Sequence, residues 1–554
     1  MTSSRTWKRC ASVAAGVSTL AGRRHEAGFP AFSKLRWVCG LIVVGTSVAL
    51  SAQTKAATPQ SIPSVGDQWT TYNGDASGRR FSTLSQINST NVKNLALAWA
   101  FPTRGLVIKG TPLVIDGVMY LTSPDKAWAI DAATGVQLWA WNRPSEGNHI
   151  ANRGVAYLNG KVYLGTPDAH LICLDAKTGK QLWDVVVADS KFSYYTAVAP
   201  LAVNGKIIVG TSGDQADIPH FLEAFDPDNG KVVWRLDTIP KAGEPGAETW
   251  PDEASRKQGG GPLWVTGTYD PALNLMYWGT GNPHPVLAGD VRKGANLYTC
   301  SILAIDPDTG KIKWFYQPSP HDTHDWDAVE TPVLFDGVFN GKPRKMLAHA
   351  SRNGYFFVLD RETGEHLLTS QFVATDWAKG LDAKGQPISD PAKESRPSGS
   401  LVHSVGNGST NWMPPSFDPQ TSLFYVNGEE GWSFWYSDLD AQGKPEDHQG
   451  GGATSLLENT VLLAMDYKTG KEVWRRPAGD SRVLAGILTT AGHLLFSGDA
   501  LGNLFALDPA TGKTLWHTRP GANLGNGPIT YSVDGKQYVA MSAADTLYVF
   551  ALPE

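Results

Sequence analysis

One short segment recurs along the body of this chain, and its regularity restricts the fold more than any other feature of the sequence. Each of its seven copies has an apolar residue pair, an Asp, two variable residues and then Thr-Gly or Asn-Gly, followed within four residues by a large apolar residue. The copies end at Trp139, Trp183, Trp234, Trp314, Leu368, Trp474 and Trp516. Asp accepts hydrogen bonds from turn amides and Gly adopts a positive φ, so each copy is typical of strand, tight turn and strand.

The spacing of the closing residues identifies the unit that repeats. An eighth segment, residues 92–99, ends in Trp99 without the turn, and the successive spacings from there are 40, 44, 51, 80, 54, 106 and 42 residues. A spacing of about 40–45 residues with four short strands is typical of one propeller blade, and longer spacings indicate loop insertions. The apolar segments 537–541 and 546–550 are expected to complete the first blade and remove open edges. The sequence therefore predicts an all-β, eight-bladed β-propeller over residues 60–554, with tryptophan-docking repeats.

The first 52 residues differ from this body in charge. They hold seven Lys or Arg and one acid; removing them from the chain's 48 basic and 53 acidic residues leaves 41 and 52, a net charge of −11. An acidic body is a poor match for phosphates, so no nucleic-acid partner is expected. Residues 37–50 form an apolar run that follows Lys34 and Arg36 and precedes small residues, the pattern of an export signal.

This apolar run is shorter than the ~20 residues that span a bilayer. We therefore expect residues 1–52 to be a signal peptide and the protein to be periplasmic and not an integral membrane protein, with an uncleaved anchor as the alternative.

The densest cluster of potentially reactive side chains follows Trp314, in the segment Pro-His-Asp-Thr-His-Asp-Trp-Asp at residues 320–327. Asp325 and Asp327 are two residues apart, so on an extended segment both carboxylates would face the same way. Paired carboxylates bind hard cations or act as general acids and bases. His321 and His324 make a zinc site an alternative, although the segment offers no third ligand at a suitable spacing. A solvated acidic loop without function is the other alternative.

Glycine-rich segments place further polar and aromatic residues in loops of the repeat. Asn282, in Gly-Thr-Gly-Asn-Pro, offers an amide carbonyl as a ligand, and Trp264 follows three glycines that would let a flat ligand stack on its ring. Arg153 and Arg352 each adjoin an Asn, and guanidinium groups suit planar carboxylates. The alternatives are a simple turn, a core tryptophan and surface ion pairs.

Together with the repeat, the segments 279–285, 296–301 and 320–327 resemble the pyrroloquinoline quinone (PQQ) dependent alcohol dehydrogenases of the methanol/ethanol dehydrogenase type, from about Gln68 to the C-terminus. The resemblance implies an oxidoreductase that converts a small alcohol to an aldehyde with PQQ and a bound Ca²⁺ or lanthanide ion. It implies PQQ contacts from Arg153, Ser212, Gly213, Trp264, Arg352 and Asn411. It implies metal ligands at Gln215, Asn282, Asp325 and Asp327, with Asp325 as the catalytic base and Asp327 as the mark of a lanthanide preference.

The resemblance departs from the family pattern at the metal site, because Gln215 stands where the family has a metal-binding Glu. The sequence has no Cys-x-x-Cys-His motif for a c-type haem, so electrons are expected to pass to a separate acceptor such as a soluble cytochrome c. Residues 370–455 are expected to cap the channel and shape the substrate pocket, with a surface excursion as the alternative. Two other functions stay open: a non-catalytic tryptophan-repeat propeller scaffold, and a quinoprotein that has lost its metal.

Overall fold

The computed structural model describes residues 65–553, apart from residues 106, 146, 148–151, 214–216, 446 and 481–484. The chain divides into two units, Met1–Ala57 and Thr58–Glu554. The predicted signal peptide, residues 1–52, lies outside the described residues. Every helix and strand below belongs to the second unit, and no helix in its described part combines the length and hydrophobicity that a bilayer crossing requires.

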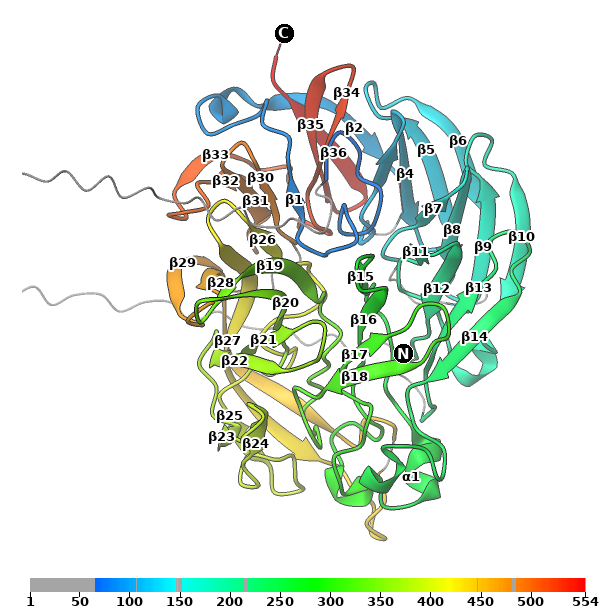
Figure 1. The fold of residues 1–554 in the computed structure, drawn as a ribbon, viewed down its shortest axis with the longest axis vertical. Coiled ribbons are helices and arrows are strands. Elements are labelled where there is room, and N and C mark those ends of the chain that lie inside the picture. Colours follow the sequence, from blue (N-terminus) through cyan, green and yellow to red (C-terminus); the bar gives the residue numbers. More distant parts are fainter. Residues whose placement is uncertain are drawn as a thin grey trace, which may run out of the picture. The chain divides into compact units, whose positions relative to one another are not determined.

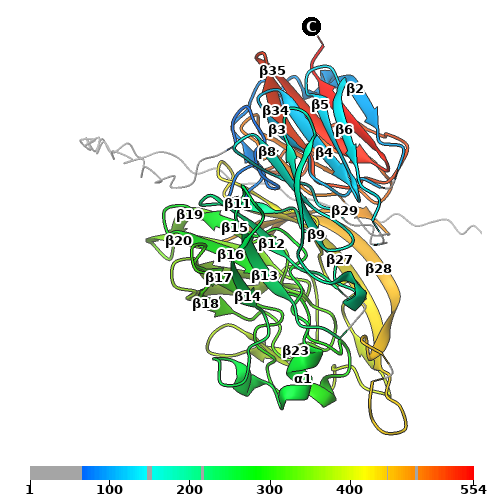
Figure 2. The ribbon, with the colours of Figure 1, turned by 90° about the vertical axis from the view of Figure 1, so that its right-hand side faces the viewer.

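The regular secondary structure of the second unit is almost entirely β-strand, and its sheets follow one another in chain order around the unit (Figures 1 and 2). Eight sheets in the described residues have four or five strands. Five of these are β3 (Leu113–Ile115), β4 (Val118–Ser123), β5 (Lys126–Asp131) and β6 (Gln137–Asn142); β7 (Ala156–Leu158), β8 (Lys161–Gly165), β9 (His170–Asp175) and β10 (Gln181–Val186); β11 (Leu201–Val203), β12 (Lys206–Gly210), β13 (Phe221–Phe225) and β14 (Val232–Asp237); β15 (Thr268–Asp270), β16 (Leu275–Gly279), β17 (Ile302–Ile305) and β18 (Ile312–Tyr316); and β19 (Val333–Phe339), β20 (Lys342–Ala350), β21 (Tyr355–Asp360) and β22 (His366–Gln371).

Two further sheets lie towards the C-terminus. One contains β25 (Ser400–Val402), β27 (Leu423–Ser437), β28 (Gly451–Asp466) and β29 (Glu472–Gly479), with β26 (Ser416–Asp418) paired to β27. The other contains β30 (Leu488–Thr490), β31 (Leu494–Gly498), β32 (Leu504–Leu507) and β33 (Thr514–Thr518), with β1 (Phe81–Ser82) parallel to β30. Strands β23 (Ala378–Leu381) and β24 (Pro387–Ser389) pair separately, and the described helices are α1 (Glu253–Gln258) and the 3₁₀ turns η1 (Val92–Asn94), η2 (Ser190–Phe192), η3 (Ala247–Thr249) and η4 (Gly289–Arg292).

The eighth large sheet joins the two ends of the unit. It combines β2 (Ala96–Pro102) with β34 (Ile529–Val533), β35 (Lys536–Ala543) and β36 (Thr546–Ala551). Strand β2 is antiparallel to β36, with Ala96 opposite Ala551. The prediction that the C-terminal strands complete the first sheet is therefore confirmed, as are the all-β class and the propeller architecture.

The closing tryptophan of one sheet contacts the turn of the next. Trp234 Nε1 donates a hydrogen bond to Pro307 O at 2.9 Å, and a Cβ on Gly310 would lie 2.6 Å from the Trp234 ring. Trp99, Trp139, Trp183, Trp314 and Trp474 approach Gly135, Gly179, Gly230, Gly364 and Gly512 in the same way. The glycine of the repeat is thus required both for its positive φ, 71° at Gly310, and for the space that the indole occupies.

We expect Gly310→Ala to destabilise the protein more than Gly205→Ala. The φ angles are 71° and 70°, so the two substitutions introduce the same left-handed strain. A Cβ at Gly205 would meet nothing within 4 Å, whereas at Gly310 it would meet Trp234. Forced overpacking costs about 1–3 kcal/mol. Thermal denaturation followed by circular dichroism should therefore give a lower thermal midpoint for Gly310→Ala than for Gly205→Ala. Equal thermal midpoints for the two variants would contradict a tight contact between the indole and the turn.

Strands β27 and β28 form a hairpin that extends well beyond its own sheet (Figure 2). The first part of β27 is in the core, where Phe424 and Tyr425 are fully buried. Near the far end, the segment before β28 is tied to the loop after β16, because the N–H groups of Val286 and Leu287 donate to His448 O and Gln449 O at 3.1 and 2.8 Å. Residues 370–455 therefore include core strands as well as a projecting ribbon that reaches the loop carrying Asn282.

Candidate active site

Two carboxylates converge on one guanidinium group. Arg352 Nη2 lies 2.9 Å from Asp325 Oδ2, and Arg352 Nη1 lies 3.4 Å from Asp327 Oδ2. The expectation of an extended segment is wrong at Asp325, which has a φ of 63°. Despite the left-handed backbone at Asp325, both carboxylates lie beside the same guanidinium group, that of Arg352.

The two carboxylates have different surroundings. The Asp325 side chain is 37% exposed, whereas that of Asp327 is 2% exposed. Burial raises the pKa of Asp327 to about 7; Arg352 opposes this shift and the Asp325 charge adds to it. Asp325 is therefore the carboxylate that a substrate can reach, while Asp327 is one whose ionised form an adjacent cation would stabilise.

Asp327 holds two other predicted site residues. Trp264 Nε1 donates to Asp327 Oδ2 at 2.6 Å, and the Asn282 backbone N–H donates to Asp327 Oδ1 at 2.7 Å. A Cβ at Gly281 would lie 3.0 Å from both carboxylate oxygens, so this close approach requires glycine. Each carboxylate oxygen has a second lone pair, which leaves it able to bind a cation as well.

Arg153 lies over the indole of Trp264. Its guanidinium carbon is 4.7 Å from the Trp264 ring centroid and 5.4 Å from that of Trp412. Tyr72 and Trp412 pack in one cluster with Trp264. The Arg153 backbone N–H donates to Ala197 O at 3.1 Å, which fixes its position on the neighbouring segment. A cation beside two indoles is an arrangement suited to a flat, anionic aromatic ligand.

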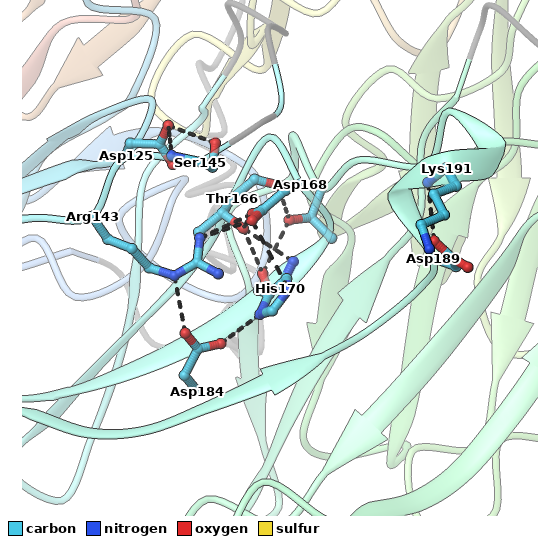
Figure 3. Close-up of polar contacts among 10 residues, drawn as sticks. Asp125, Arg143, Ser145, Thr166, Asp168, His170, Asp184, Asp189 and Lys191 are labelled. Carbon is cyan, nitrogen blue, oxygen red and sulfur yellow. Dashed lines mark hydrogen bonds and ion pairs between the residues drawn. The ribbon is translucent and has the colours of Figure 1, made fainter.

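An ion-pair network holds the start of the loop that leads to Arg153 (Figure 3). Arg143, just after β6, forms ion pairs with Asp168 and Asp184. Its Nη1 lies 2.9 Å from Asp168 Oδ2, and its Nε lies 2.9 Å from Asp184 Oδ2. His170 Nδ1 lies 2.6 Å from the other oxygen of Asp184. These contacts attach the loop to β9 and β10 before it continues through residues 148–151, which lie outside the described residues.

Ser212 and Gly213, which are also predicted to bind the cofactor, lie beside the backbone segment that leads to Trp264. Ser212 is 1% exposed, and its Oγ has no hydrogen-bond partner in the described residues. It adjoins Gly213 and follows Thr211, whose carbonyl accepts from the N–H of Leu263, directly before Trp264, at 2.9 Å. Gln215 lies outside the described residues.

Asn411 is linked to Arg352 through one carbonyl group. The backbone oxygen of Asn407 accepts from Asn411 Nδ2 at 3.1 Å and from Arg352 Nε at 3.2 Å. The structure therefore brings Asn411, Arg352, both aspartates, Trp264, Asn282 and Arg153 into one continuous set of contacts.

The two histidines of the 320–327 segment have packing roles. The His324 ring stacks on Trp326 with centroids 4.0 Å apart, and its Nε2 is 2.8 Å from Lys393 O. His321 Nδ1 is 2.8 Å from Gly294 O. No group of three or more His, Cys, Asp or Glu residues placed to hold a metal is found in the described part of the chain. A zinc site therefore has no support, and the predicted metal site depends on Asn282 with the two aspartates.

The sequence interpretation missed a buried pair beside Arg352. Glu330 and His349 are 3% and 0% exposed, and Glu330 Oε2 lies 3.7 Å from His349 Nε2. Burial raises the pKa of Glu330 well above its usual value and lowers that of His349 to about 3. Burial thus favours the neutral form of both side chains. Neither residue belongs to a recognisable motif. Glu330 follows Asp327 by three residues and His349 precedes Arg352 by three, and only this proximity in sequence could have indicated a role.

The residues present fit the two groups that the resemblance implies. PQQ is planar and bears carboxylates, which match the Trp264 face, the two arginines and the Ser212 hydroxyl, which has no hydrogen-bond partner among the described residues. Asn282 Oδ1, which makes no hydrogen bond to another described residue, would join the carboxylates of Asp325 and Asp327 as oxygen ligands for a hard cation.

Known proteins share this chain's architecture over most of its length. The family model "PQQ: Glucose/ethanol/alcohol dehydrogenase, beta-propeller domain" matches residues 69–397 and 459–539. Quinoprotein alcohol dehydrogenase PedH of Pseudomonas putida is 38% identical over 503 residues, 84% of this chain and 84% of that protein. Quinohemoprotein alcohol dehydrogenase from Comamonas testosteroni has a TM-score of 0.82 and 34% identity over 88% of this chain and 82% of that chain. A europium-containing methanol dehydrogenase has a TM-score of 0.80 and 31% identity over 88% of this chain and 98% of that chain. The chain belongs to the PQQ-dependent glucose/ethanol/alcohol dehydrogenase family of β-propellers.

Proposed function

We propose that this protein is a periplasmic quinoprotein that oxidises an alcohol to an aldehyde with PQQ and a bound metal ion. The observation that carries the proposal is the accessible Asp325 carboxylate, paired with Arg352 beside the Trp264–Asp327 unit. A scaffold propeller has no need of this combination of a reachable base, a buried second carboxylate and an arginine-covered indole.

Asp325 is the base in this proposal. Its Oδ2 accepts the hydroxyl proton of the alcohol, and the 2.9 Å contact with Arg352 orients the carboxylate. When bound, PQQ supplies the two-electron acceptor for the hydride that leaves the carbinol carbon. Trp264, fixed by its bond to Asp327, provides the flat surface, and Arg153 provides positive charge beside it. The alcohol loses one proton and one hydride in total, which gives the aldehyde.

The proposed metal ligands are Asn282, Asp325 and Asp327, with Gln215 in the position that the family fills with Glu. Two adjacent carboxylates supply more negative charge than one, which suits a trivalent lanthanide better than Ca²⁺. A relative that is 31% identical, the europium-containing methanol dehydrogenase, contains a lanthanide, and this supports the assignment.

The remaining parts of the proposal concern architecture and electron transfer. We assign an eight-bladed propeller whose blades dock through tryptophans, with residues 370–455 capping the channel and residues 1–52 directing export to the periplasm. Electrons from the reduced cofactor pass to a separate cytochrome-type acceptor.

Reconstitution tests the metal and the reaction together. Metal-stripped protein is loaded with PQQ and either La³⁺ or Ca²⁺, and dye-linked turnover is measured over a panel of alcohols. We expect turnover in both cases and at least ~10-fold higher kcat/KM with La³⁺. Activation by Ca²⁺ alone would contradict the lanthanide assignment. Absence of turnover with every alcohol, although absorbance shows that PQQ is bound, would contradict the dehydrogenase and favour a scaffold or a quinoprotein without metal.

A further inference from the structure

A pocket of about 310 Å³ opens beside Asp325, and the projecting hairpin forms much of its wall. The residues that line it include Leu287, Asp325, Asn407, Trp435, Gln449 and Ser455. The volume is about ten times the ~30 Å³ that one water molecule occupies in the liquid. An alcohol of one or two carbons would leave most of this space to water, so the pocket has room for a longer substrate.

Two side-chain amides in the pocket make no hydrogen bond within the described part of the chain. The contacts of Asn407 with Arg352 and Asn411 use its backbone oxygen. Gln449 is held by its backbone as well, because its N–H donates to Asp447 and its carbonyl accepts from Leu287. Each amide offers two donor hydrogens and an acceptor oxygen. The backbone contacts thus fix both residues while their polar ends remain for a ligand.

The rest of the lining favours a neutral ligand. Asp325 is the only charged residue among the described residues of the wall, and it would repel a carboxylate. The Ser455 hydroxyl, which accepts from the Gly406 N–H at 3.3 Å, adds another polar group. Leu287 and Trp435 supply apolar contact for a short carbon chain.

We infer that this pocket selects neutral diols and polyols over monohydric alcohols of equal chain length. The inference rests on the proposed alcohol oxidation at Asp325. One hydroxyl lies at Asp325 while a second, several carbons away, exchanges hydrogen bonds with the amides of Asn407 and Gln449. A methyl end in the same place would remove water from these amides without replacing its hydrogen bonds, which disfavours the monohydric substrate.

The direct test compares n-hexanol with its terminal diol in protein loaded with PQQ and metal. We expect kcat/KM per reactive end to be roughly tenfold higher for the diol, as for one or two hydrogen bonds gained. Gln449→Leu should bring the ratio close to one. Gln442→Leu, which changes an exposed glutamine of the same segment, should leave the ratio unaltered.

A second substitution, Gly406→Leu, tests whether the size of the pocket matters. A Cβ at Gly406 would meet Ser455 and Ala453 at the ordinary distances of 3.4 and 3.6 Å, and Gly406 is not among the residues with positive φ. Gly406→Leu should therefore fold normally and fill the pocket. We expect it to lower kcat/KM several-fold more for the terminal diol than for ethanol.

Binding without turnover separates the two proposals. The hexane diol that bears two methyl groups on each carbinol carbon keeps the same separation between its hydroxyls, but it has no carbinol hydrogen and therefore cannot lose hydride. It should raise the thermal midpoint more than its monohydric analogue does, and Gln449→Leu should abolish the difference. Equal binding and equal kcat/KM for each matched pair, unchanged by Gln449→Leu, would overturn the inference while alcohol oxidation stands. Loss of all turnover would instead contradict the proposed function, and the binding comparison with the methylated diol would still decide the selectivity of the pocket.

Discussion

Asp325→Asn is expected to lower kcat for alcohol oxidation by about 10³- to 10⁴-fold, the upper range for loss of a general base. An amide cannot accept the hydroxyl proton, yet its oxygen can still accept a hydrogen bond from Arg352, which lies 2.9 Å from the present carboxylate. The side chain is 37% exposed, so its ion pair adds only about 1 kcal/mol to stability. The thermal midpoint should accordingly change little.

This variant needs a readout that separates chemistry from cofactor loss. PQQ retention is measured by absorbance and by quenching of tryptophan fluorescence, and reduction of the bound cofactor is followed in a single turnover. Asp438→Asn, which changes an exposed carboxylate directly after β27, is the matched control and should keep full activity. If Asp325→Asn with bound PQQ and metal retained more than about a tenth of kcat, the base would have to be another group.

The propeller was predictable because the chemistry of its repeat is local. In one copy the N–H groups of Asp308 and Thr309 donate to Asp306 Oδ1 at 2.9 and 3.2 Å, and Gly310 takes the positive φ. Every group involved lies within five residues, so the sequence pattern contains the whole turn. The projecting hairpin was not predictable in the same way, because β27 continues as one strand from buried Phe424 past the end of the core. Only pairing with β28 decides where such a strand leaves its sheet.

The site was predictable in its residue types but not in its connections. The aspartates, Trp264, Asn282 and Arg352 could be selected from short motifs and from the family resemblance. The bonds that Asp327 accepts come from residues 63 and 45 positions away, and no local pattern encodes them. The left-handed φ of Asp325 was missed because that conformation is uncommon for a residue with a side chain. Asn407 and Gln449 were missed because lone amides in loops carry no signal of their own.

Asp327 provides the second large effect, since it combines a proposed metal-ligand role with a structural one. Its two oxygens accept hydrogen bonds from Trp264 Nε1 and the Asn282 backbone. Asp327→Ala would leave both donors without an acceptor, at about 1–3 kcal/mol each. Asp327→Asn keeps the shape and one acceptor oxygen but turns its NH₂ group toward the other donor. We therefore expect metal-free stability to fall in the order wild type, Asn variant, Ala variant, measured by thermal denaturation.

Metal selectivity should follow a different order. Both substitutions remove the same negative charge, so both should lower La³⁺ activation relative to Ca²⁺ by at least ~10-fold, although their stabilities differ. Activity at matched PQQ occupancy with each ion provides the measurement, and Asp438→Asn should keep the wild-type ratio. An unchanged La³⁺ preference in both variants would show that Asp327 does not bind the ion. Equal stability of the Asn and Ala variants would show that its hydrogen bonds to Trp264 and Asn282 contribute little. Because charge controls the first result and hydrogen bonding the second, the two roles of this carboxylate can be separated in one pair of proteins.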